Sequence, residues 1–275
     1  MKTKILFALS LVFFASAVFG VDGREPGQII MGYNASAKDP LIAAAPDNSG
    51  AYLDLYTRVA QKIGFELKVV RYPKSRVYQL MKEGKIDFYP GMKFEKDRAD
   101  FAYFIANGLP TGRTGISRLD LPEITDLSQL RGKRVVIPID GIDYTESVDG
   151  TLVKRVRQLD IKKAHQLLVN DRADFYATDD VVVATFLKNN NLDDIRIHPD
   201  FLPTTSMTLG FSRFSPLYEA AKNPAYDPAR GPSVDNDPYE PVTGSVPYKM
   251  QQALKEMIRD GEIDAIYRQY FTAER

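Results

Sequence analysis

An alternation of strand and helix patterns along residues 28–92 constrains the fold more than any other feature of this sequence. Apolar residues recur at helical spacing in two stretches, and each stretch stops at a glycine, Gly64 or Gly84. Short runs typical of strands lie before, between and after these stretches. The expected order is strand, helix, strand, helix and strand, over residues 28–33, 52–63, 65–72, 75–83 and 86–92. This alternation predicts an α/β fold in which helices cover a mainly parallel sheet.

A second alternation of the same kind begins near Thr114. Asp126 is placed to cap a short helix that stops at Gly132. The expected strands cover residues 134–137, 173–177, 195–198 and 207–212, and the expected helices cover residues 151–158, 162–169 and 181–188. Two helical stretches on either side of Gly261 complete the chain. Two α/β units therefore follow one another in the sequence.

The first twenty residues have the pattern of a secretory signal peptide. Lys2 and Lys4 precede a nearly continuous apolar run, which stops at small residues such as Ala17 and Gly20. This order is typical of an exported chain, with cleavage after Ala17 or Gly20. The run is shorter than the roughly 20 apolar residues of a membrane-spanning helix. We therefore expect removal of residues 1–20 and no membrane insertion of the mature protein.

The chain has no cysteine, so an exported fold must depend on its apolar core rather than on disulfides. The cysteine that a lipoprotein needs for acylation is missing too, and an untethered protein fits the periplasm of a Gram-negative cell best. Basic and acidic side chains are balanced at 36 each, without blocks of Lys or Arg. Such a chain is a poor binder of nucleic acid.

Residues 222–247 differ in composition from the rest of the chain. They hold six of its 17 prolines, together with Gly, Asp and Asn and few aliphatic residues. This composition predicts a long surface loop or insertion. Both a solvated loop and a lid or docking element fit it.

Seven short motifs follow one another along the chain. Gly50-Ala-Tyr-Leu-Asp-Leu55 fits the pattern G-x-x-x-D-L, and Leu130-Arg-Gly-Lys-Arg-Val135 fits L-x-G-K-x-V. The others lie at residues 83–87, 91–104, 173–179, 209–213 and 254–270. Together they resemble the bacterial extracellular solute-binding proteins of family 3, the polar amino-acid receptors of ABC transporters, over most of the mature chain.

The resemblance implies a type II periplasmic-binding-protein fold, in which two α/β lobes are joined by a two-segment hinge. The implied lobe one comprises residues 28–113 and 214–275, with the insertion 222–247, and the implied lobe two comprises residues 114–212. The hinge would consist of extended crossings near residues 114–118 and 207–212. Ligand would bind between the lobes, which would close around it by a hinge motion.

The resemblance also implies a function. A monomer would capture a small polar solute that bears a carboxylate, an amino acid or a related compound, and deliver it to an inner-membrane ABC permease. No cofactor is implied. His165 and His198 are far apart in a chain without cysteine, so the sequence indicates no metal site.

Two charged residues carry the implied site. Arg98 matches the family arginine that holds the ligand's carboxylate, and a guanidinium can make two parallel bonds to a carboxylate where lysine cannot. Asp179 matches the lobe-two carboxylate that receives the ligand's α-ammonium. The residues alone favour a different interpretation, with Arg98 on a solvated turn and Asp179 as the cap of the helix that follows it.

Three further residues are candidates by the same resemblance. Tyr33 ends the first strand, where the family places an aromatic residue near the ligand, although a core tyrosine fits as well. Arg76 resembles the arginine in the P-W-x-R segment of a subgroup, and its alternative is a helix-surface residue. Gly141 matches the loop whose backbone N–H groups receive a carboxylate.

The chain departs from the family pattern close to these candidates. Pro90, Lys93 and Glu95 stand where small hydroxyl residues are usual, and Ile142 stands where a Ser or Thr usually follows the glycine of lobe two. The missing hydroxyls would have bonded the ligand's ammonium and carboxylate. Lys93, if its side chain points inward, adds positive charge. These departures favour a more anionic or carboxylate-only solute over an ordinary α-amino acid.

Two other classes of function stay open. Relatives such as cyclohexadienyl dehydratase perform chemistry in the same cleft, and the general acid that this requires has candidates in Asp143, Glu146 and Asp180. The sequence has no nucleophile motif or phosphate loop. Alternatively, the protein serves a sensor or another periplasmic partner, for which residues 222–247 would be the docking element.

Overall fold

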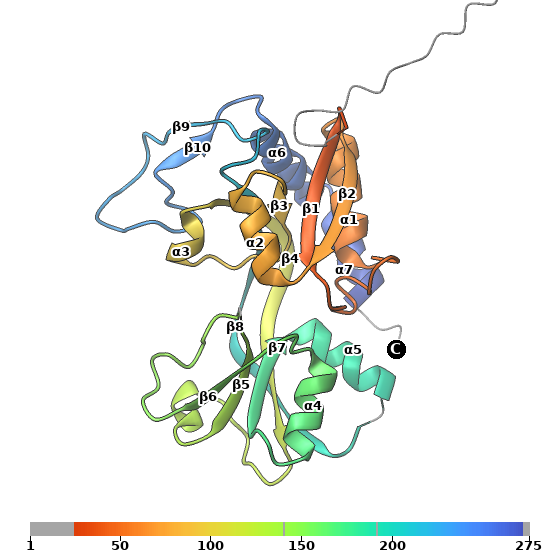
Figure 1. The fold of residues 1–275 in the computed structure, drawn as a ribbon, viewed down its shortest axis with the longest axis vertical. Helices are drawn as coiled ribbons and strands as arrows, with labels where there is room; N and C mark the ends of the chain where they lie inside the picture. Colours follow the sequence, from red (N-terminus) through yellow and green to blue (C-terminus); the bar gives the residue numbers. More distant parts are fainter. Residues whose placement is uncertain (1–24, 140, 191, 272–275) are drawn as a thin grey trace, which may run out of the picture.

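The structure, a computed structural model, describes residues 25–139, 141–190 and 192–271. These residues form two α/β lobes, one above the other in Figure 1, with two long strands running between them. The predicted α/β class is confirmed. The predicted signal peptide, residues 1–20, lies outside the described part of the chain. In that part, no helix is both long enough and apolar enough to cross a membrane.

Lobe one begins with the predicted strand–helix alternation. Its first elements are β1 (Gln28–Asn34), α1 (Ala51–Lys62), β2 (Glu66–Tyr72), α2 (Lys74–Lys82) and β3 (Phe88–Tyr89). β1 lies between β2 and β3 and pairs with both in parallel. α1 buries Tyr52, Leu55 and Val59, the apolar face that the spacing in the sequence predicts. Gly64 follows α1 with a φ of 81°, a conformation that glycine adopts readily, and so lets the chain turn into β2.

Lobe two repeats the alternation. Its elements are the 3₁₀ helix η1 (Leu127–Leu130), β5 (Arg134–Pro138), β6 (Leu152–Val156), α4 (Ile161–Val169), β7 (Phe175–Asp179) and α5 (Asp180–Asn190). β5 pairs in parallel with β6 and β7. Asp126 caps η1 as predicted, since its side chain accepts the Ser128 N–H and the Gln129 side chain reaches back to the Asp126 backbone.

Two long strands, β4 (Ala102–Arg118) and β8 (Ile195–Ser212), connect the lobes and pair antiparallel. They join both lobes into one sheet with the strand order β2-β1-β3-β8-β4-β7-β5-β6. The register between β4 and β8 shifts in the stretch from Ala106 to Gly115, where β4 leaves the core of lobe one and approaches that of lobe two. This irregular stretch is the crossing visible in Figure 1.

Three expectations about local structure are wrong. Residues 151–158, predicted as a helix, contain β6 instead. Residues 152–156 pair in parallel with β5, and Gln158, the last residue of the predicted helix, has a positive φ of 49°, which a right-handed helix does not admit. The two strands expected over residues 195–212 are one, because pairing with β4 continues between the lobes. β7 ends two residues later than predicted and so includes Asp179.

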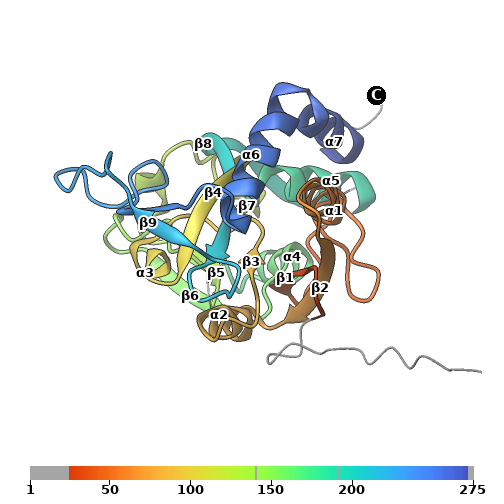
Figure 2. The same cartoon turned by 90° about the horizontal axis from the view of Figure 1, so that it is seen from above.

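After β8 the chain returns to lobe one. The remaining elements of this lobe are α3 (Lys96–Ala99), β9 (Ala220–Lys222), β10 (Tyr239–Pro241), α6 (Val246–Arg259) and α7 (Glu262–Phe271). α6 and α7 pack against α1. The predicted insertion 222–247 is closed at its base by the antiparallel pair of β9 and β10, and it projects on the side of lobe one away from α1 (Figure 2).

Each lobe has an apolar core, and Val181 and Val182 at the start of α5 pack into the core of lobe one. The largest cluster fills lobe one and includes the fully buried Tyr56, Phe88 and Phe211. In lobe two, Val136 belongs to one apolar cluster and its neighbour Val135 to another, because successive strand residues point to opposite faces of the sheet. Where the lobes face each other, a cavity remains between them.

Candidate functional site

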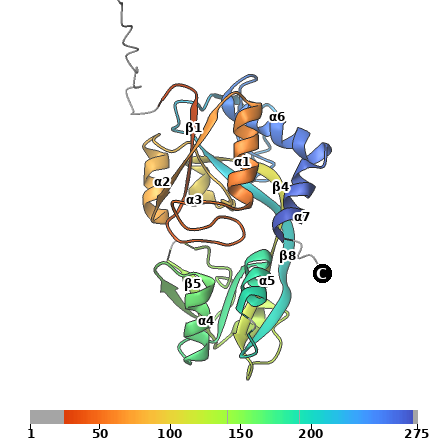
Figure 3. The ribbon, with the colours of Figure 1, turned by 90° about the vertical axis from the view of Figure 1, so that its right-hand side faces the viewer.

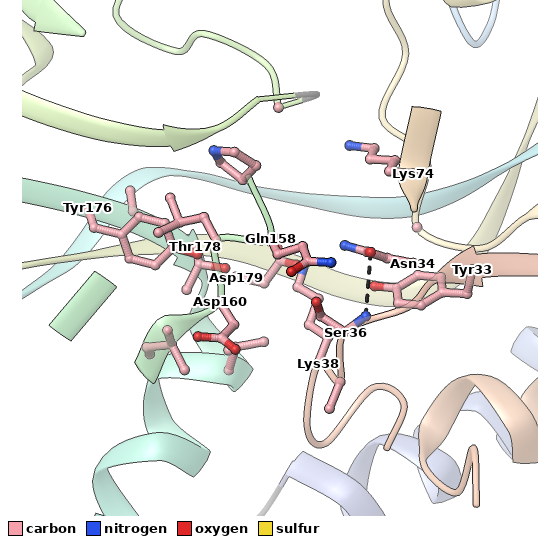
Figure 4. Close-up of a pocket in the computed structure, with 18 of the residues that line it drawn as sticks. Tyr33, Asn34, Ser36, Lys38, Lys74, Gln158, Asp160, Tyr176, Thr178 and Asp179 are labelled. Atoms are coloured by element: carbon pink, nitrogen blue, oxygen red, sulfur yellow. Dashed lines mark hydrogen bonds and ion pairs between the residues drawn. The ribbon is translucent and has the colours of Figure 1, made fainter. Parts of the chain in front are cut away.

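The cavity between the lobes has a volume of about 920 Å³. Lobe one contributes residues at or beyond the carboxyl ends of β1 and β3, such as Tyr33 and Lys93, and lobe two contributes residues at the ends of β5 and β7, such as Asp179. Figure 4 shows Tyr33 and Asp179 in the wall of this cavity. Ligands of open α/β sheets bind beyond the carboxyl ends of the strands, and small-molecule sites have volumes of this order. This cavity is therefore the candidate binding site.

An ion pair between Asp179 and Lys38 crosses the cavity from one lobe to the other. Asp179 is buried at the end of β7, and Lys38 comes from the loop that descends from β1 towards lobe two (Figure 3). The second carboxylate oxygen of Asp179 lies 3.9 Å from the Lys93 ammonium and accepts a 3.4 Å hydrogen bond from the Thr111 hydroxyl. The carboxylate is thus surrounded by cations and donors of this same chain.

Burial and proximity set the charges of this cluster. Burial alone would raise the pKa of Asp179, but the positive charges of Lys38 and Lys93 outweigh it and lower this pKa to about 2. Burial disfavours the Lys38 ammonium, yet the charge of Asp179 raises the pKa of this lysine above its ordinary value. Burial and the guanidinium of Arg113 lower the pKa of Lys93 to about 8. Lys93 is therefore the group of this cluster that titrates nearest to neutral pH.

Arg98 lies on the short helix α3 and lines the same cavity from lobe one. Its guanidinium donates to the backbone carbonyl of Lys93 at 3.0 Å and lies over the Tyr78 ring, 5.7 Å from the ring centroid. Among the described residues, Arg98 forms no ion pair with a carboxylate. Because a guanidinium carries five N–H donors, most of its hydrogen-bonding capacity remains for an anion in the cavity.

Tyrosines form part of the lobe-one wall. Tyr33 stacks on Tyr89 with 5.1 Å between the ring centroids and meets the edge of Tyr52 at 5.6 Å. Burial raises the pKa of Tyr33, so its hydroxyl keeps its proton at neutral pH. The sequence left open whether Tyr33 belongs to the core or to the site. The structure places it in both, since its side chain is buried and also lines the cavity.

Two predicted candidates do not have the surroundings that their roles require. Arg76 does not line the cavity; it lies on α2 with its guanidinium 3.6 Å from the Glu83 carboxylate, so the helix-surface alternative is the one observed. Gly141 does line the cavity, but its N–H donates to the Pro138 carbonyl at 2.8 Å in a turn. That N–H is therefore not available to a ligand carboxylate.

Lys38 and Arg113 are cavity residues that sequence reasoning missed. Lys38 follows the first strand, so the rule that ligands bind beyond strand ends could have pointed to it. Arg113 lies on β4 in the irregular crossing, with its guanidinium over the Tyr144 ring at 5.3 Å. Its local sequence carries no comparable signal.

The cavity carries an excess of positive charge. Of the described residues, seven basic side chains line it, Lys38, Lys74, Lys93, Arg98, Arg113, Arg157 and Lys162, against three acidic ones, Asp39, Asp160 and Asp179. Basic and acidic residues are equal in number over the whole chain, so this excess belongs to the cavity. Such a concentration of one sign attracts ligands of the opposite sign.

The three carboxylates considered as general acids lie outside the lining of this cavity. Asp143 accepts hydrogen bonds from Thr145, and Asp180 accepts the N–H of Val181 at the start of α5. Glu146 lines a smaller neighbouring pocket of about 310 Å³. Over the described ranges, no cluster of His, Cys, Asp and Glu is arranged to hold a metal ion.

Comparisons with known proteins agree with this architecture. The sequence model of the bacterial extracellular solute-binding proteins, family 3, matches residues 29–273. No curated protein sequence matches the chain significantly. An ancestral arginine-binding protein bound to arginine has a similar structure, with a TM-score of 0.66 and 20% identity over 90% of this chain and 99% of that one.

Two other solved structures are similar. One is the substrate-binding protein of an amino acid ABC transporter, with a TM-score of 0.65 and 16% identity over 89% of this chain and 99% of that chain. The other is an ancestral amino acid-binding protein, a precursor of cyclohexadienyl dehydratase, with a TM-score of 0.63 and 17% identity over 90% of this chain and 96% of that chain. At such identities these likenesses establish the shared two-lobed fold, and the ligand has to be argued from the site.

Proposed function

The chain belongs to family 3 of the bacterial extracellular solute-binding proteins, and from this premise we propose that it is a periplasmic receptor that delivers a small, carboxylate-bearing solute to an inner-membrane ABC permease. The observation that carries the proposal is Arg98, whose guanidinium lines a cavity between two lobes without a carboxylate partner among the described residues. Export rests on the signal-peptide pattern of residues 1–20.

In this proposal, the solute is held by groups from both lobes. Arg98 of lobe one takes the carboxylate with paired, charge-assisted hydrogen bonds. The lobes close around the solute by bending in the stretch of β4 from Ala106 to Gly115, where the register with β8 is irregular. A solute that contacts both lobes favours the closed state, because only that state offers all of its contacts.

The experiment begins with a thermal-shift screen of the purified protein against amino acids, amines, dicarboxylates and oxo acids. A carboxylate at a hundredfold excess over its Kd stabilises the folded state by about 2.7 kcal/mol, which is a visible shift in Tm. Calorimetry then gives Kd for the wild type and for Arg98→Ala, Arg98→Lys and Arg76→Ala.

Arg98→Ala is expected to weaken binding about 100-fold or more, since each charge-assisted bond contributes about 1.5–3 kcal/mol. Arg98→Lys, which retains the charge but loses the paired geometry, should weaken binding about tenfold. Arg76→Ala is the matched control, because it removes an arginine outside the cavity and should leave Kd unchanged. An Arg98→Ala protein with wild-type Kd contradicts the proposed role of this residue.

Delivery to a permease and catalysis are tested separately. Cells that lack the protein are expected to take up the identified solute more slowly, and restored expression should restore uptake. Binding without any effect on uptake would instead favour a sensor or another periplasmic partner. Incubation with prephenate or arogenate is expected to leave both unchanged, and their turnover would replace the receptor proposal by an enzymatic one.

A further inference from the structure

Three acidic side chains line the cavity among the described residues, and only one of them, Asp179, is buried. Asp39 is exposed, and the Asp160 carboxylate caps α4 by accepting the N–H of Lys163 at 2.8 Å. Asp179 is the buried one of the three, and Lys38 already forms an ion pair with it. At this buried carboxylate, a cationic ligand group would therefore have to compete with a lysine of the protein itself.

This competition is unfavourable for two reasons. Lys93 stands 3.9 Å from the same carboxylate, so a ligand ammonium beside Asp179 would be a third positive charge around one negative charge. Displacing Lys38 instead would leave its ammonium, whose side chain is only one-third exposed, without its partner in the cavity. Binding beside Lys38 and displacing Lys38 therefore both disfavour a ligand that places an ammonium group at Asp179.

Anionic ligand groups, in contrast, find cations in the cavity that have no carboxylate partner among the described residues. Among the described residues, neither Arg98 nor Arg113 forms an ion pair with a carboxylate, and each lines the cavity. Burial and the positive charge of Arg113 both disfavour the ammonium form of Lys93. A bound anion would offset the repulsion between these two cations. The cations that remain after Lys38 has neutralised Asp179 are thus suited to carboxylates.

We propose that the ligand is a carboxylate without an ammonium group, such as a dicarboxylate or a 2-oxo acid, and that Lys38 is the specificity-determining residue. The Lys38 ammonium already pairs with Asp179. The cavity therefore rejects an amino acid that has the same carbon skeleton as the ammonium-free ligand. This inference rests on the proposed function, since it concerns which carboxylates the same cavity takes.

The test uses ligand pairs that differ at the amino group: succinate with aspartate, 2-oxoglutarate with glutamate, and pyruvate with alanine. Calorimetry measures Kd for both members of each pair on the wild type, on Lys38→Met and on Lys162→Met. The wild type is expected to bind the ammonium-free member of at least one pair at least about tenfold more tightly than its amino partner. Lys38→Met frees Asp179, and this preference should fall by about tenfold or reverse.

Lys162→Met is the matched control, because it removes one positive charge from the cavity lining and leaves the pair of Lys38 and Asp179 in place. Its Kd values for both members of a pair should change by the same factor. Tighter binding of the amino acids by the wild type would overturn the inference and leave the proposed function standing. Failure of every carboxylate to bind would overturn both. The wild-type ratios decide the question even if Lys38→Met does not fold.

Discussion

Acidification is expected to destabilise the protein through His198, which is completely buried in lobe two. Its Nδ1 accepts the backbone N–H of Ile124 at 2.9 Å, so the proton of the neutral ring sits on Nε2, which lies 2.8 Å from the Ser117 hydroxyl. Protonation would place a second proton on Nδ1 and break the bond to Ile124. The site is therefore built for the neutral ring.

The size of the effect follows from the shift in pKa. Burial, with a smaller contribution from the charge of Arg196, lowers the pKa of His198 from 6.5 to about 4. Below pH 6.5 the unfolded chain binds the proton more readily than the folded protein, so stability falls as the pH drops from 6.5 towards 4. Each pKa unit corresponds to about 1.36 kcal/mol, and the loss attributable to His198 is about 3 kcal/mol at pH 4.

The assay is urea unfolding followed by circular dichroism at several pH values from 7 to 4. Carboxylates titrate in the same range, so the informative quantity is the difference in unfolding free energy between the wild type and His198→Gln. That difference should shrink by about 3 kcal/mol from pH 7 to pH 4. His165→Gln removes the other histidine of the chain, on α4 beside Asp194, and retains the His198 contribution. Parallel pH curves for the wild type and His198→Gln would refute the reasoning.

Two more predictions concern the cavity and the strand that crosses it. The affinity for an anionic ligand should decrease above pH 8, by up to about tenfold per pH unit. The reason is that the pKa of Lys93 is about 8 in the ligand-free protein, and the bound anion favours the ammonium form of this lysine. Calorimetry from pH 7 to 10 checks this dependence on pH, and Lys93→Met should remove it. Gly115→Ala should reduce the unfolding free energy by about 1–3 kcal/mol in urea titrations, because the added Cβ would lie 2.2 Å from a ring carbon of Phe175. Wild-type stability of this variant would show that the ring can move aside.

Local signals predicted most of the secondary structure correctly, and they failed where pairing decides conformation. The spacing of apolar residues predicted α1 and α6 because a helix repeats every 3.6 residues whatever surrounds it. β6 was missed because its five residues have an apolar spacing that a short helix also shows. Only its parallel pairing with β5 makes it a strand.

Some residues of the binding site could be predicted from the sequence, and others depended on how the helices pack. A resemblance in motif order was enough to indicate Arg98, Tyr33 and Asp179, and a departure from the same pattern indicated Lys93; all four line the cavity. Arg76 had equally suggestive sequence neighbours, but it faces Glu83 on the helix surface. Which side of a short helix faces the cavity depends on how that helix packs, and the motif does not contain that information.

The sequence by itself determined that this chain alternates strands and helices in two successive units, because periodicity, helix caps and glycine stops act over a few neighbouring residues. The tertiary structure alone decided that Lys38 meets Asp179, 141 residues further along the chain. This ion pair forms because β1 of lobe one and β7 of lobe two both end at the same cavity. Where these two strands end is set by the order of strands in the sheet and by the way β4 and β8 cross between the lobes. The inferred preference for carboxylates without an ammonium group follows from that meeting.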